Sequence, residues 1–160
     1  MRVRIAAVAG VLLAGAALAQ QGGGGHAGHG FTLPPDPRVV ITFPAEVRDF
    51  FRSEMRGHLD QLNTLIGLLG EGDMKKAGEF ARTGLAVAGN HPPGAPNPGR
   101  FAPPEFRAMG QAMHKAAGEI DRVANAASTP PTAADWKAVT AAVGTLTSAC
   151  AGCHAPFRLQ

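Results

Sequence analysis

Two cysteines and a histidine close to the end of the chain carry the clearest chemical signal in the sequence. Residues 150–154 read Cys-Ala-Gly-Cys-His, and Cys150 and Cys153 are the two cysteines of the 160-residue chain. In this spacing two thiols can add to the vinyl groups of haem while the histidine ligates the iron. At positions i, i+3 and i+4 of a helix, Cys150, Cys153 and His154 project to the same side. We therefore expect one covalently attached haem c.

Two other interpretations of the same motif are weaker. A zinc site needs two further cysteines or histidines at matching spacing, and a thioredoxin-like redox pair lies at the start of a helix that follows a strand. Here the motif lies near the end of the last predicted helix. Haem is attached to such proteins outside the cytoplasm, so the interpretation also requires an exported chain.

The first 19 residues are typical of a signal peptide. Arg2 and Arg4 precede an apolar run at 5–18, and Ala-Leu-Ala at 17–19 is a suitable cleavage site. The run is too short to span a bilayer comfortably, so we expect a periplasmic protein whose mature chain has no membrane span. Removing the two arginines lowers the formal charge from +3 to +1, with 13 basic and 12 acidic side chains. This balance argues against a nucleic-acid partner.

A glycine-rich leader is predicted at 20–43, continuing through a proline-containing stretch. His26 and His29 could hold copper or zinc, but glycine-rich chain supplies no fixed geometry and no further ligands. We expect a flexible linker here, and metal binding by the two histidines stays an open alternative.

From residue 44 onward the apolar residues recur at helical spacing. The pattern predicts helices over 44–69, about 73–89, about 104–127 and from 132 through Phe157, separated by glycine- and proline-rich breaks. Thr132 and Asp135 resemble a capping box. The fold class that follows is all-α, an antiparallel four-helix bundle over 44–160 with no competing strand pattern. Residues expected to face its core include Val47, Leu65, Ala77, Val87, Ala88, Met109, Met113, Ile120, Val139 and Leu146.

This predicted core is poor in large side chains, because many of its inward positions are alanine or glycine. A bundle of this length packed mainly by alanine would bury little apolar area. A cofactor between the helices would fill that volume, which agrees with the haem motif.

The chain resembles the cytochrome c′ family, the class II c-type cytochromes. The resemblance rests on a haem motif at the end of a four-helix bundle, followed by Phe157 and Arg158. It implies that Cys150 and Cys153 anchor the haem, that His154 is the proximal ligand, and that Arg158 lies against the haem on the proximal side.

The chain departs from the family pattern in two places. Family members commonly carry an arginine four residues before the distal residue, whereas here Phe51 holds that position and Arg52 stands three before Met55. Pro156 follows the ligand closely, so the last helical turn is expected to be distorted.

The resemblance implies that the first helix faces the distal side of the haem, where the sixth ligand binds. Met55 and His58 lie there on one face, and both residue types ligate haem iron. Met55 is either that ligand or a core methionine, and His58 is either a ligand or a partner of a haem propionate or the backbone. His91 and His114 are lesser candidates, and Met109 and Met113 are interpreted as core.

Two functions from different classes remain open. With Met55 or His58 on the iron, the protein is a one-electron carrier that serves redox partner proteins and is not an enzyme; Met55 is the preferred ligand. With neither, a pocket lined by Phe51, Met55 and His58 binds a diatomic gas such as NO or CO. Peroxidase-like chemistry with His58 as acid and base is a weaker third alternative. Homodimers through the first two helices occur in the family and are left open here.

Overall fold

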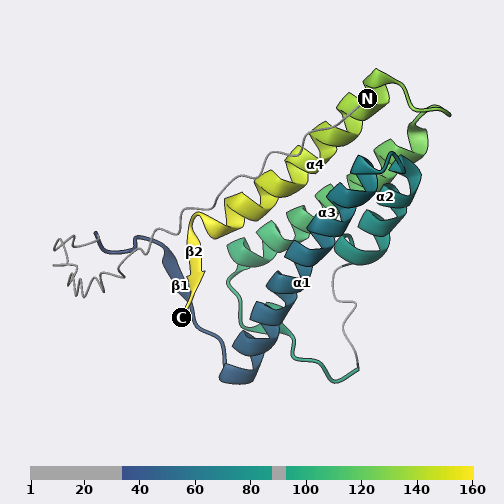
Figure 1. Cartoon of the computed structure of the whole chain (residues 1–160). Coiled ribbons are helices and arrows are strands. Elements are labelled where there is room, and N and C mark those ends of the chain that lie inside the picture. The colour runs from purple at the N-terminus through teal and green to yellow at the C-terminus, as the bar shows by residue number, and fades with distance from the viewer. Residues whose placement is uncertain (1–33, 88–92) are drawn as a thin grey trace, which may run out of the picture. The chain divides into compact units, whose positions relative to one another are not determined.

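The computed structural model describes residues 34–87 and 93–160, and residues 36–160 form one compact unit (Figure 1). The predicted signal peptide, the leader histidines His26 and His29, and the residues Ala88 and His91 lie outside the described ranges. Within those ranges no helix is long and apolar enough to cross a membrane.

The described unit is mostly helical, as predicted. Its four α-helices are α1 (Ala45–Gly70), α2 (Met74–Phe80), α3 (Pro104–Ala126) and α4 (Ala133–His154). A single π-helical segment, η1 (Ala81–Leu85), continues α2, and a 3-10 turn, η2 (Pro98–Arg100), precedes α3.

Local signals set the helix ends where the sequence indicates. Gly72 follows α1 with a φ of 86°, a conformation that glycine adopts without strain. The side chain of Asp73 caps α2 by accepting a hydrogen bond from the backbone N–H of Lys76 at 3.0 Å. Thr132 and Asp135 form the predicted capping box at the start of α4.

The second helical segment is shorter than predicted. It ends with η1 at Leu85 rather than near residue 89, because the backbone widens into a π-turn in which Ala86 N–H bonds the carbonyl of Ala81. Val87, predicted to face the core, is 42% exposed as a result.

The core is built largely from small side chains, as the sequence indicates. α3 packs closely on both α4 and α2. α2 approaches α3 closely at Gly78, where an added Cβ would lie 2.6 Å from the Cβ of Ala124. The large side chains at the centre of this core are Leu65, Met74, Leu85, Ile120, Val139 and Leu146.

Two short strands were not expected from the sequence. β1 (Val39–Ile41) pairs in parallel with β2 (Phe157–Leu159), and Figure 1 shows this pair beyond the end of α4. The expectation that the fourth helix continues through Phe157 is wrong. α4 ends at His154, just before Pro156, which lacks the N–H that a further helical turn needs.

The strand β1 also changes the description of the segment before α1. Ile41 and Phe43 are buried in a second apolar cluster together with Val47 and Ala102. Residues 36–43, assigned to the flexible leader by composition, therefore belong to the same compact unit as the helices.

Candidate functional site

The Cys-x-x-Cys-His motif occupies the last two turns of α4. Cys150 and Cys153 are free thiols that are half-buried, whereas His154 is exposed. Burial raises the pKa of both thiols above the ordinary value, and the nearby Cys150 raises that of Cys153 further. In this state the two thiols are neutral at pH 7.

A large cavity of about 1070 Å³ lies beside the motif, between α1, α3 and α4. Its size is at the upper end of the usual range for small-molecule and cofactor sites. All three motif residues line it, together with the predicted site residues Phe51, Met55 and His58. The structure thus brings together the residues that sequence analysis grouped from the first and last helices.

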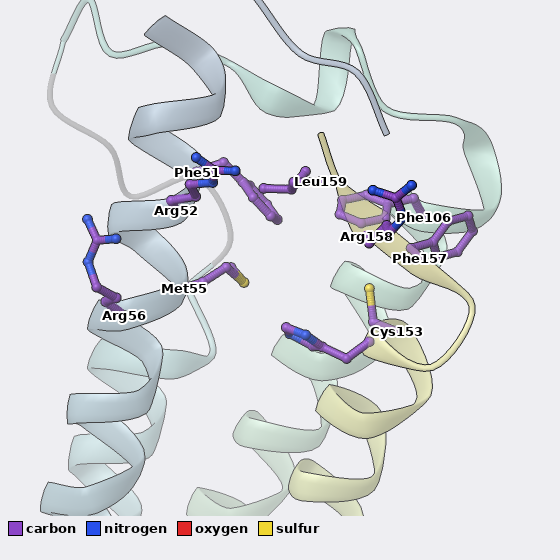
Figure 2. Close-up of a pocket in the computed structure, with 10 residues that line it drawn as sticks. Phe51, Arg52, Met55, Arg56, Phe106, Cys153, Phe157, Arg158 and Leu159 are labelled. Atoms are coloured by element: carbon purple, nitrogen blue, oxygen red, sulfur yellow. The ribbon is translucent and has the colours of Figure 1, made fainter. Parts of the chain in front are cut away.

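A smaller cavity of about 230 Å³ shares part of this lining. Met55, Cys153 and His154 are among the residues that line it. Figure 2 shows Met55 on α1 with its side chain directed toward α4, and Cys153 near the end of α4. The remaining lining residues are Phe51, Arg52, Arg56, Phe106, Phe157, Arg158 and Leu159.

Met55 and His58 are not equivalent in this arrangement. Met55 and His154 line both cavities, whereas His58 lines only the larger cavity. The His58 ring instead meets the His114 ring edge to face, with the ring centroids 6.0 Å apart. Of Met55 and His58, Met55 alone lines the smaller cavity, together with His154.

His114, a lesser candidate by sequence, is held by the backbone. Its Nδ1 lies 2.7 Å from the carbonyl oxygen of Leu85. Because a carbonyl can only accept, Nδ1 carries the proton in the neutral ring and Nε2 keeps the lone pair. His114 is thus a fixed polar wall of the larger cavity, next to His58.

An aromatic cluster closes one end of the site. Phe51 lies 5.5 Å from Phe43 and 5.6 Å from Phe106, and Phe106 lies 5.4 Å from Phe157, all measured between ring centroids. Phe51 was expected from the sequence as a site residue, whereas Phe106 was not singled out for the site. The signal for Phe106 was its position in the first turn of α3, after the proline-rich connection.

Arg158 lines the smaller cavity, as the resemblance implied for a residue near the site. Its Nε is buried without a hydrogen bond and lies 3.4 Å from a carboxylate oxygen of Asp36. Arg52 and Arg56 line the same cavity from α1, so its described lining residues include three guanidinium groups and no carboxylate side chain. Arg56 was not singled out from the sequence, although it directly follows Met55.

The two methionines interpreted as core residues, Met109 and Met113, differ in burial. Met113 is buried in the core, while Met109 is half-buried, and both contribute to the wall of the larger cavity. In the described part of the chain, no group of three or more histidine, cysteine or acidic side chains could hold a bare metal ion.

No protein-family model, no curated protein and no solved structure matches the chain.

Proposed function

We propose that the protein is an exported, periplasmic monohaem c-type cytochrome that carries one electron at a time between redox partner proteins. Its helices are proposed to form an antiparallel cytochrome c′-like bundle around the haem. The observation that carries the proposal is one cavity lined by Cys150, Cys153, His154 and Met55.

The residues around the cavity fit a haem in both chemistry and size. Two thiols and an imidazole of the larger cavity lie on one helix, a thioether lies on another helix of its lining, and phenylalanines supply apolar walls. The guanidinium groups of Arg52, Arg56 and Arg158 line the smaller cavity, which suits a pocket that receives an anionic group. A bound haem supplies the one-electron chemistry by cycling between ferric and ferrous iron.

Each chain residue then has a defined role. Cys150 and Cys153 would hold the haem covalently on α4. His154 and Met55 would be the residues that hold its iron. A thioether ligand raises the reduction potential relative to a second imidazole, and the aromatic cluster keeps water from that end of the site.

The first test is covalent attachment. The chain, produced by export in a bacterial host that attaches haem, should show a haem stain on a denaturing gel and a mass increase of one haem. Cys150→Ser together with Cys153→Ser should lose both signals. A purified wild-type protein without covalent haem, from a host that loads a control c-type cytochrome, contradicts the proposal.

The second test identifies the sixth ligand. The ferric wild-type protein should be low-spin and show the sulfur-to-iron charge-transfer band. Met55→Leu should lose the band and become high-spin, while the matched control Met74→Leu, a buried methionine outside the cavity lining, should keep it. A low-spin spectrum without the band that changes in His58→Leu would assign ligation to His58, and a high-spin wild-type spectrum would favour the gas-binding alternative.

A further inference from the structure

The two strands join the ends of the helices that carry the site. β1 leads into α1 after three residues, and β2 follows His154 after two. The N–H of Val39 donates to the carbonyl of Pro156 at 2.8 Å, and the N–H of Gln160 donates to the carbonyl of Ile41 at 3.3 Å. The start of α1 and the end of α4 are therefore held together by backbone pairing.

Side chains add three further ties across the same junction. Arg52 donates from Nη2 to the main-chain oxygen of Gln160 at 3.0 Å, and Thr42 bonds the Gln160 side chain at 3.0 Å. Asp36 lies 3.4 Å from Arg158 and accepts hydrogen bonds from Arg38. Hydrogen bonds from Arg38 lower the pKa of Asp36 to about 2, so its charge persists in mild acid.

These ties matter because α1 and α4 do not pack closely on each other in the described part of the chain. α4 packs on α3, and α1 packs on α2 and η1, with the large cavity between α1 and α4. Helix packing thus leaves the spacing across the site weakly fixed at the end where Met55 and His154 lie. Arg52, which bonds the residue after β2, stands three residues before Met55.

We propose that β1 and β2, with Asp36 and Arg52, form a clamp that sets the distance between Met55 and His154. The clamp thereby determines whether Met55 reaches the iron, so the residues before α1 are positioning residues for the sixth ligand. This inference rests on the proposed function, because it requires a haem held by His154.

Two neighbouring proline substitutions distinguish loss of the β1–β2 pairing from a general loss of stability. Val39→Pro removes the N–H that bonds Pro156, while the Val39 side chain is 56% exposed and contributes little to the core. Val40→Pro is the matched control, because N–H groups of consecutive strand residues point to opposite edges and that of Val40 points away from β2. Val40 is also exposed, at 41%.

The assay uses the haem-loaded full chain and imidazole as an added ligand of the ferric iron. Val39→Pro should increase the high-spin fraction and lower the dissociation constant for imidazole by about fivefold or more, because binding improves as the Met55-free state becomes populated. Val40→Pro should stay within about twofold of wild type. Equal behaviour of the two variants overturns the clamp.

If Val39→Pro yields no folded, haem-loaded protein, a second pair of variants tests the clamp instead. Asp36→Asn should weaken the Arg158 tie and shift imidazole binding in the same direction, by less. Glu119→Gln, which breaks an exposed ion pair with Arg122 on α3, should leave binding unchanged. The inference is overturned if these two variants bind imidazole with equal affinity. It is also overturned if the wild-type protein is already high-spin. Absence of covalent haem in wild type and Val40→Pro identifies failure of the proposed function itself.

Discussion

The close approach of α2 and α3 can be tested by adding one methyl group. In Gly78→Ala, the new Cβ would lie 2.6 Å from the Cβ of Ala124 and 3.2 Å from the Cα of Asp121. Ala124 is fully buried, so neither contact can be relieved by moving a flexible side chain. Forcing extra atoms into a packed core costs about 1–3 kcal/mol.

A second effect of the substitution has the opposite sign. Alanine in a helix interior is more stable than glycine by roughly 0.5–1 kcal/mol. Gly144→Ala on α4 isolates this gain, because a Cβ at Gly144 meets nothing within 4 Å. The propensity gain cancels between the two variants, so Gly78→Ala should be less stable than Gly144→Ala by about 1–3 kcal/mol.

The assay is thermal unfolding of both haem-loaded variants, followed by far-ultraviolet circular dichroism at equal concentration. The expected gap in melting temperature is about 3 °C or more for a domain of this size. Gly144→Ala should melt at or above the wild-type temperature. If Gly78→Ala melts together with Gly144→Ala, the two helices do not approach as closely as described, and the small-residue packing of α2 on α3 is refuted.

Two further predictions concern α4. Thr132→Ala should lower the free energy of unfolding by about 1 kcal/mol through loss of the capping box, whereas Thr145→Ala on the same helix should not, as urea unfolding would show. In the folded chain before haem attachment, burial raises the pKa of Cys150 and Cys153, so less thiolate is present at any given pH. Iodoacetamide should therefore alkylate these thiols more slowly at pH 8 in the folded chain than in the urea-unfolded chain, and the rate in the folded chain should rise with pH. Equal rates in the folded and unfolded chains would contradict the burial.

Much of the helical framework could be predicted from the sequence because its signals are local. The bounds of α1 and α3 and the capping box at Thr132 follow from apolar spacing and from polar or glycine residues at helix ends. The grouping of Met55 with Cys153 and His154 beside one cavity was implied by the family resemblance rather than by the apolar pattern of the helices.

The parts that could not be predicted depend on contacts distant in sequence. β1 is three residues long, and its partner strand lies more than a hundred residues later in the sequence. The segment is too short to show the alternation of apolar and polar residues that predicts a strand. The π-turn that ends the second helical segment at Leu85 has no residue signature comparable to a proline or a cap. The ion pair between Asp36 and Arg158 likewise becomes visible only once β1 and β2 are paired.

The pairing of β1 with β2 also implies an order of folding events. Thr42 and Gln160 are 118 residues apart in sequence, so their contact closes a long loop and forms more slowly than the local contacts within each helix. The strands are therefore expected to pair after the helices have formed. Until then the last turns of α4 are not tied to the start of α1, so the Cys150 and Cys153 thiols stay open on that side, as the proposed covalent attachment of haem would require.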